Sequence, residues 1–428
     1  MKKSSSLKNI FWNFVGLSFY GIASLFYLLI VKSINGIDAS GIFSYSYSLC
    51  TLFFYIALFY NRTFQISNNI NLKFNDYLSS RFIYCFLSLA FITFYTIFTT
   101  SNITKILVVV LLMLFRIMDA ISDTFYALFQ TSDRLDIVGK SYTFKSIVSI
   151  LIFLVIDLVT CNLVASCLGI VICNLFFLIF YDLKQFKKNY GETKIELSLK
   201  NFKLITFESS YIFVFSFMAV FLSNAQKYIL EYYALDSIQG VFAILIMPAT
   251  VLSLISGYIL NPFLNELKKL CSTKKYKQYF NYTLRILLYI VVVGTLGTIF
   301  CYFFGTEILS FIYGENLITY KLDLSLVILG ATFNALAVTI SSFLILLNHN
   351  KEQVYFYAVA IVVAVLYCVL FYNANNYIRI SILSYLFSYF ILLMIFLMSY
   401  FYIVKKLVKK GDCYEKQKSK SKHCNSLL

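Results

Sequence analysis

Charged residues are scarce in this sequence of 428 residues: Asp, Glu, Lys and Arg together make up 13%, whereas 60% of the residues are hydrophobic. A soluble domain carries about twice that share of charge. The composition therefore excludes an ordinary soluble protein and predicts an all-α, polytopic membrane protein. Because a helix needs roughly 20 residues to cross a bilayer, the length leaves room for about twelve transmembrane helices.

Residues that bind metals are also few. The sequence contains only two histidines, His349 and His423, and its ten cysteines form no C-x-x-C pair. Most of the cysteines lie within apolar segments, where cysteine serves as a small hydrophobic residue. We therefore expect neither a zinc site nor a disulfide framework, and we predict no metal and no cofactor.

Enzyme motifs are missing as well. Gly139-Lys140-Ser141 is similar to the end of a nucleotide-binding P-loop, but the P-loop pattern requires glycine at the position of Arg134. Membrane polymerases of surface polysaccharides generally place their catalytic residues on a long external loop. The longest external connection expected here, Gly305 to Asp323, is too short to fold alone. The sequence therefore predicts a transporter and not an enzyme.

Apolar segments long enough to cross a bilayer recur along the whole chain. The twelve expected spans are residues 10–31, 40–60, 82–100, 106–130, 142–160, 163–181, 204–226, 238–261, 284–304, 324–347, 354–373 and 380–404. The first span exceeds the roughly 7–15 apolar residues of a signal peptide, so we expect it to remain as a helix. The only two prolines, Pro248 and Pro262, flank the eighth span and predict a kink there.

The net charge of +16 is explained by the position of the basic residues. Most Lys and Arg residues fall in the N-terminus, in every second connection and in the C-terminal tail. This set includes the second connection (Arg62, Lys73, Arg81) and the fourth (Arg134, Lys140, Lys145). The positive-inside rule places these segments in the cytoplasm, so we predict a multi-pass membrane protein with both termini cytoplasmic. Contact with anionic lipids accounts for the charge, and we expect no nucleic-acid binding.

The polar segment from Asp182 to Lys203 divides the chain into two sets of six spans. We predict an N-terminal six-helix bundle at residues 1–190, a C-terminal six-helix bundle at residues 191–404 and a basic cytoplasmic tail at residues 405–428.

A short motif occurs in both halves. Asp38-Ala-Ser-Gly41-Ile-Phe43 follows the first span, and Asp236-Ser-Ile-Gln-Gly240-Val-Phe242 follows the seventh. Repeated bundles with the substrate path between them are typical of transporters. Chance similarity between two short motifs remains the alternative.

The fourth span, Ile106 to Gln130, carries charges in the middle of apolar sequence. Arg116, Asp119 and Asp123 share one helical face, because offsets of three and seven residues return to nearly the same angle. A charge at mid-membrane costs roughly 2.5–3.5 kcal/mol, so this face must contact protein or water. Two interpretations remain open: the charges pair and lock helices together, or they mark the path of a substrate or ion. One cation against two carboxylates suits a proton or sodium relay as well as an anionic ligand.

Two short motifs follow the second and fourth spans. R-x-x-Q-x-S runs from Arg62 through Gln65 to Ser67. Q-x-x-x-R-x-D-x-x-G-K runs from Gln130 through Arg134 to Lys140. With these motifs, twelve spans and basic cytoplasmic connections, the sequence resembles the O-antigen and capsular repeat-unit flippases (Wzx type) of the multidrug/oligosaccharidyl-lipid/polysaccharide exporter superfamily. The resemblance covers nearly the whole chain. It implies alternating-access transfer of an undecaprenyl-diphosphate-linked oligosaccharide from the inner to the outer leaflet.

The substrate-binding residues predicted on this basis are Arg62, Arg116, Gln65, Gln130 and Arg134. A guanidinium group matches phosphate oxygens bidentately, which favours Arg62 and Arg116 for the diphosphate. For Arg134, an ion pair with a neighbouring aspartate is an equally open interpretation.

Coupling to a proton or sodium gradient is expected at Asp119, Asp123 and Glu208. For Glu208 the alternative is a side chain that reaches the cytoplasmic interface. The implied partners are membrane lipids, a polysaccharide polymerase and a chain-length regulator. Two other functions remain open: a multidrug cation antiporter of the same superfamily, and, less favoured, a membrane polysaccharide polymerase.

Overall fold

The computed structural model describes residues 6–59, 62, 65–66, 72–192, 198–347, 349–372 and 376–425. Helices account for nearly all of these residues, and the described segments contain no strand. The prediction of an all-α protein is therefore confirmed. The chain forms two compact units.

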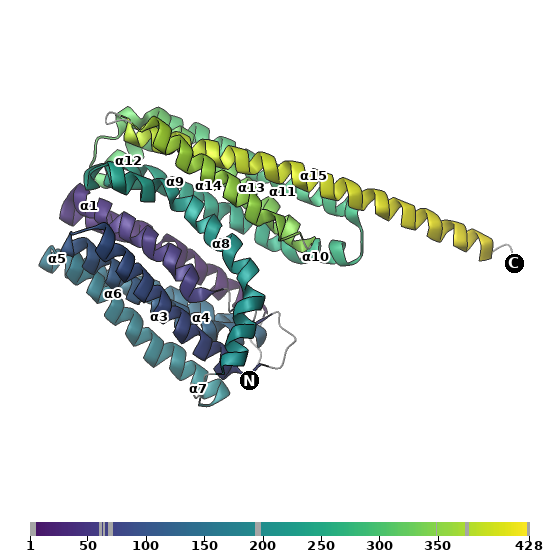
Figure 1. The fold of residues 1–428 in the computed structure, drawn as a ribbon, viewed down its shortest axis with the longest axis horizontal. Helices are drawn as coiled ribbons and strands as arrows, with labels where there is room; N and C mark the ends of the chain where they lie inside the picture. Colours follow the sequence, from purple (N-terminus) through teal and green to yellow (C-terminus); the bar gives the residue numbers. More distant parts are fainter. Residues whose placement is uncertain are drawn as a thin grey trace. The chain divides into compact units, whose positions relative to one another are not determined.

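The first unit comprises Met1–Ile244 with two short pieces, Ile312–Gly314 and Asn373–Ile378. Its elements are α1 (Ser6–Leu58), α3 (Phe74–Thr99), α4 (Ile103–Thr131), α5 (Leu135–Thr160), α6 (Leu163–Phe177), the π-helical turn η1 (Leu178–Leu183), α7 (Lys184–Tyr190), α8 (Leu199–Tyr233) and the start of α9 (Asp236–Leu260). α4 is the central helix of this unit, since α1, α3, α5 and α6 all contact it (Figure 1).

The second unit comprises Leu245–Phe311, Glu315–Tyr372 and Arg379–Leu428. After α9 it contains η2 (Asn261–Phe263), α10 (Leu264–Ser272), α11 (Tyr276–Phe300), η3 (Cys301–Gly305), α12 (Thr306–Tyr313), η4 (Ile318–Tyr320), α13 (Lys321–Leu346), α14 (Glu352–Phe371) and α15 (Tyr377–Asn425). The long helix α13 packs against α11 and η3 and is mostly buried. α15 continues through most of the predicted basic tail. The predicted domain boundaries stay a prediction.

Ten of the described helices are long and apolar enough to cross a membrane. One of them, Leu7–Leu58, contains two expected spans, because α1 bends at Gly36. Gly36 has φ 87° and ψ −177°, a conformation that glycine alone adopts readily. α4 supplies the remaining expected span, with Arg116, Asp119 and Asp123 in its apolar sequence. Each of the twelve predicted spans therefore lies in a helix.

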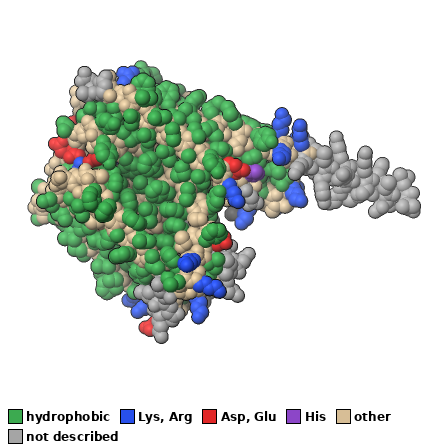
Figure 2. All heavy atoms as spheres, viewed as in Figure 1, with side chains coloured by type: hydrophobic (Ala, Val, Ile, Leu, Met, Phe, Trp, Pro, Cys, Tyr) green, Lys and Arg blue, Asp and Glu red, His purple; other side chains and the backbone are tan. Residues whose placement is uncertain are grey.

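Large hydrophobic side chains cover the outside of these helices. Phe207 on α8 is 78% exposed and Phe311 on α12 is 90% exposed. In Figure 2, hydrophobic side chains cover most of the viewed face, and charged side chains lie toward its edges. Such a surface is unfavourable in water, because it exposes a large apolar area. It is stable in lipid, because the backbone hydrogen bonds of a helix are formed within the helix itself. The chain is thus a multi-pass membrane protein, as predicted.

The two copies of the short sequence motif lie against each other inside the first unit. A Cβ atom on Gly41 would be 1.9 Å from the carbonyl oxygen of Asp236, and one on Gly240 would be 2.4 Å from the carbonyl oxygen of Ile37. Glycine at both positions therefore lets α1 and α9 approach at backbone contact. The phenylalanines that end the two motifs, Phe43 and Phe242, are both buried.

Replacing Gly41 with alanine is expected to destabilise the protein by about 1–3 kcal/mol, since the new methyl group meets backbone that cannot rotate away. Gly257→Ala on α9 is the matched control, because a Cβ atom there has open space. Gly257→Ala should be neutral or stabilise by about 0.5–1 kcal/mol. Thermal unfolding of both variants in detergent measures the difference, and equal stability would contradict the close crossing.

Candidate functional site: a buried charge network in the first unit

The charged face of α4 points into the interior of the first unit. Arg116 is 6% exposed and Asp119 is 5% exposed. The side chain of Asp123 is 13% exposed. Because helices surround α4 on several sides, these charges contact protein, which satisfies the requirement drawn from the sequence.

Asp123 binds two arginines. Its Oδ1 accepts a hydrogen bond from Nη1 of Arg62 at 2.8 Å, and its Oδ2 accepts one from Nη2 of Arg81 at 3.1 Å. Arg62 also donates to Oε1 of Gln130 from Nε at 3.2 Å and from Nη2 at 2.7 Å. The structure therefore brings together three residues that the sequence predicted, Arg62, Gln130 and Asp123, and adds Arg81.

The two arginines differ in accessibility. The side chain of Arg62 is 24% exposed, whereas that of Arg81 is completely buried. Arg81 donates further hydrogen bonds to Oγ1 of Thr124 at 2.9 Å and to the carbonyl oxygens of Ala57 and Leu58 at 3.0 and 2.6 Å. Arg81 thus fixes the end of α1 to α3 and α4, and Arg62 is the member of the pair that a ligand can reach.

Arg116 lies among aromatic rings. Its guanidinium carbon is 4.6 Å from the centre of the Tyr47 ring and 5.2 Å from the centres of the Phe54 and Phe115 rings. A cation over the face of an aromatic ring is stabilised by about 0.5–2 kcal/mol, more as water is excluded. The rings therefore hold the charge in an interior that contains little water.

The polar contacts of Arg116 are incomplete. Nη1 donates to the hydroxyl of Tyr20 at 2.8 Å and Nη2 donates to Oγ1 of Thr51 at 3.2 Å. The nearest oxygen of Asp119 is 3.8 Å away. Nε is buried and has no hydrogen-bond partner among the described residues. Arg116 is therefore only loosely paired with the carboxylate on its own helix.

Asp119 has a second cation partner, Lys145 on α5. Nζ of Lys145 lies 3.5 Å from Oδ1 of Asp119 and 3.4 Å from Oδ2 of Asp182. Asp182 belongs to the widened turn η1 and is 1% exposed, and Lys145 is 2% exposed. The hydroxyl of Tyr20 donates to Oδ2 of Asp119 at 3.0 Å, so Tyr20 joins Arg116 to Asp119.

These side chains form one network in which cations outnumber carboxylates. Tyr142 lies close to both of its parts, since it interacts with Arg62 and its ring lies 4.8 Å from that of Tyr20. The described ion pairs of the network contain four cations (Arg62, Arg81, Arg116, Lys145) and three carboxylates (Asp119, Asp123, Asp182). The sequence had placed one cation against two carboxylates. The structure reverses the sign of the local charge, and an excess positive charge in a weakly polar interior attracts an anion.

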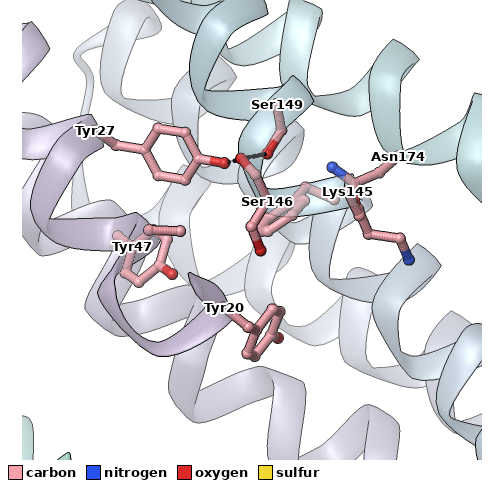
Figure 3. A pocket seen from close by; sticks show the side chains of 9 residues that line it. Tyr20, Tyr27, Tyr47, Lys145, Ser146, Ser149 and Asn174 are labelled. Carbon is pink, nitrogen blue, oxygen red and sulfur yellow. Dashed lines mark hydrogen bonds between the residues drawn. The ribbon is translucent and has the colours of Figure 1, made fainter. Parts of the chain in front are cut away.

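A small pocket adjoins the network (Figure 3). Its lining consists of Tyr20, Ala23, Tyr27, Tyr47, Phe115, Lys145, Ser146, Ser149 and Asn174. The hydroxyls of Tyr27 and Ser149 are 2.6 Å apart, and Oδ1 of Asn174 is buried without a hydrogen-bond partner among the described residues. The pocket has room for about one water and is too small for an oligosaccharide.

Gln65 and Glu208, two further predicted residues, lie apart from the ion pairs of the network. Both ends of the Gln65 amide are buried without a hydrogen-bond partner among the described residues. Ser67 of the same motif lies outside the described residues. Glu208 lies on α8 with an exposed side chain, and none of the described ion pairs of the network includes it.

The motif after α4 has structural roles. Nε of Arg134 donates to Oδ1 of Asp136 at 2.7 Å, and Nη2 donates to Oδ2 at 3.2 Å, so the two form a bidentate pair. A Cβ atom on Gly139 would lie 2.1 Å from the carbonyl oxygen of Trp12, so glycine lets α5 pack against α1. The geometry favours the ion-pair interpretation for Arg134.

Arg134→Ala is therefore expected to lower the free energy of unfolding by about 1 kcal/mol or less, since a partly exposed ion pair contributes no more than that to stability. Thermal unfolding in detergent measures the effect. A loss of several kcal/mol would contradict this weak, local role.

Sequence reasoning missed Arg81, Lys145 and Asp182. Arg81 and Lys145 were assigned to cytoplasmic connections, and this assignment is wrong, because both are buried within α3 and α5. Asp182 was assigned to the polar segment between the halves, whereas it is buried in η1. One signal was present: Ser141, Lys145 and Ser149 recur every four residues and form a polar stripe on a helix.

The fold is similar to that of solved membrane transporters. An inward-facing multidrug resistance transporter of the MATE family, MOP superfamily, aligns with 95% of this chain and 99% of its own, with a TM-score of 0.70 and 10% identity. The lipid II flippase MurJ, in an inward closed conformation, aligns with 95% of this chain and 93% of its own, with a TM-score of 0.69 and 13% identity. At these identities the likeness shows the fold alone, which this chain shares with known transporters.

The sequence comparison finds a relative named for capsular polysaccharide biosynthesis. The chain is 21% identical over 403 residues to the capsular polysaccharide biosynthesis protein CapF of Staphylococcus aureus, which covers 94% of this chain and 100% of that protein. No family model matches the chain. Together with the two structures, this relative confirms the resemblance that the sequence predicted.

Proposed function

We propose that this protein is a flippase that moves undecaprenyl-diphosphate-linked oligosaccharide repeat units from the cytoplasmic to the outer leaflet of a bacterial plasma membrane, for synthesis of a capsule or O-antigen. The observation that carries the proposal is the excess of cations over carboxylates in the buried network. The likeness to a flippase for lipid II and to a capsule-synthesis protein supports it.

The physical task of such a protein is to keep a diphosphate solvated by something other than water. An anionic headgroup cannot enter hydrocarbon unaided, because it would lose its hydration. Arg62, the most accessible cation of the network, is proposed to contact the diphosphate first. The excess positive charge, to which Arg116 contributes, holds the headgroup. The amide of Gln65, which has no hydrogen-bond partner among the described residues, and the side chain of Gln130 bind its polar groups.

Coupling to an ion gradient is proposed at Asp119, Asp123 and Glu208. Protonation of Asp119 or Asp123 would release a cation of the network for the diphosphate, which links proton binding to substrate binding. Both termini are proposed to lie in the cytoplasm, with a polysaccharide polymerase and a chain-length regulator as partners on the export route.

A deletion strain tests the proposal. Loss of the gene should abolish surface polysaccharide and leave lipid-linked repeat units on the cytoplasmic side of the membrane, and a plasmid copy should restore export. Unpolymerised single repeats on the outer face would favour a polymerase. Unchanged polysaccharide with increased susceptibility to cationic drugs would favour a multidrug antiporter, since one similar structure is that of a multidrug resistance transporter.

A further inference from the structure

Lys145 on α5 occupies a box of oxygen atoms formed by two other elements of the first unit. Besides the carboxylates of Asp119 on α4 and Asp182 on η1, Oγ of Ser122 lies 3.2 Å from its Nζ. All four side chains are almost completely buried. One ammonium group, carried by α5, thus sits between two carboxylates that lie on other elements.

The two carboxylates need a cation between them. Two buried negative charges repel one another strongly in a weakly polar interior. Asp182 accepts hydrogen bonds from Ser122 at 2.7 Å, Ser141 at 2.6 Å and Tyr126 at 3.1 Å, but Lys145 is its only cation partner among the described ion pairs. The charge of Lys145 therefore makes the pair of carboxylates possible.

The distances in the box indicate which cation fits it. Oxygen ligands hold small metal ions such as calcium and magnesium at about 2.0–2.6 Å. The three oxygens here lie 3.2–3.5 Å from the nitrogen. The box is therefore wider than a small dehydrated metal ion requires, and its oxygens suit an ammonium group that donates several weak hydrogen bonds.

We propose that Asp119, Asp182 and Ser122 form a binding site for an ammonium-sized monovalent cation, and that Lys145 permanently fills this site as a tethered occupant. A free cation cannot bind to these carboxylates while the lysine is present. The proposal goes beyond the flippase function and holds whatever substrate the protein carries. A sodium gradient then cannot act through the pair formed by Asp119 and Asp182.

The neighbouring pocket lies against this site. Lys145 forms part of the pocket wall, together with the buried amide of Asn174 and the hydroxyls of Ser146 and Ser149 (Figure 3). Shortening Lys145 to alanine joins the pocket to the oxygen box and leaves the two carboxylates without their shared cation. A small soluble ammonium ion can then replace the one that was removed.

The test is a melting experiment on the full-length protein in detergent, with methylammonium chloride as the probe and choline chloride at equal ionic strength as the control salt. Methylammonium copies the end of the lysine side chain, whereas choline is larger and has no N–H donors. Lys145→Ala should lower Tm by about 5 °C. Methylammonium should restore Tm in a saturable manner and choline should not. The wild-type protein should respond to neither salt.

Lys140→Ala provides the matched control, because Lys140 lies on the same helix, with its Nζ 5.3 Å from the centre of the Trp12 ring and outside the oxygen box. This variant should show no specific response to methylammonium. If Lys145→Ala aggregates, its purification is repeated with methylammonium throughout, and recovery of monodisperse protein only in that salt supports the proposal. Three results would overturn it: equal effects of methylammonium and choline, aggregation in both salts, or radioactive sodium binding to the wild-type protein that Asp119→Asn abolishes.

Discussion

Arg116→Ala is expected to reduce export of surface polysaccharide at least about 30-fold, because a desolvated charge contact is worth about 2–5 kcal/mol. The substitution leaves three cations against three carboxylates, so the network loses its excess positive charge. The variant should still fold, since Asp119 keeps Lys145 and Tyr20 as partners. Lipid-linked repeat units on the cytoplasmic side, measured at matched protein level, report the block.

Two further variants separate charge from geometry at this position. Arg116→Lys keeps the number of cations and should retain part of the activity, but less than the wild type, because an ammonium group cannot bind phosphate in the planar bidentate manner of arginine. Arg285→Ala is the control, since Arg285 is exposed on α11 and lies 5.8 Å from the ring of Tyr282. Normal export by Arg116→Ala would remove Arg116 from the mechanism.

Asp123→Ala is expected to cause the largest loss of stability, about 3–5 kcal/mol. It leaves the fully buried guanidinium of Arg81 without a carboxylate, and it also releases Arg62. Asp323→Ala on α13 is the control, because the partner of Asp323 is an exposed arginine 3.9 Å away, and a pair of that kind contributes about 1 kcal/mol or less. Thermal unfolding in detergent compares the two variants.

A second substitution tests the cause of this loss. Adding Arg81→Leu to Asp123→Ala removes both buried charges, so the double variant should be more stable than Asp123→Ala alone. Two results would contradict this explanation: Asp123→Ala is as stable as the wild type, or the double variant is less stable than Asp123→Ala. Either would show that the burial of Arg81 does not require the carboxylate of Asp123.

The helices and the charged face of α4 could be predicted from the sequence, because both depend on local patterns. Apolar length predicts a span, and spacing along one helix predicts that Arg116, Asp119 and Asp123 share a face. Their burial follows from the cost of placing charge in lipid. None of these steps requires knowledge of what lies on a neighbouring helix.

The partners of that face could not be predicted, because they come from distant parts of the chain. Arg81 lies 42 residues from Asp123 and Lys145 lies 37 residues from Asp182. Counting basic residues as topology signals placed both in loops, although each lies near the end of an apolar segment where a loop charge and a buried charge look alike. The positive net charge of the network could therefore be recognised only in the folded structure.

The partner of Arg134, by contrast, is close in the sequence. Its partner Asp136 is two residues away, so the ion pair could be proposed from the sequence, and the structure contains it. The same motif holds Gly139, whose contact with α1 depends on a residue more than a hundred positions earlier. A short motif can thus combine a local contact that is predictable with a distant one that is not.

The most direct test of the account is a leaflet-exchange measurement with the purified protein in liposomes. Two labelled lipids are compared, an undecaprenyl-diphosphate-linked oligosaccharide and an undecaprenol-linked oligosaccharide that lacks the diphosphate. The account predicts that the wild-type protein moves the first lipid and not the second, and that Arg116→Ala moves neither. Equal movement of both lipids, or transport of the diphosphate lipid by Arg116→Ala at the wild-type rate, would contradict the claim that an excess of buried cations carries the headgroup.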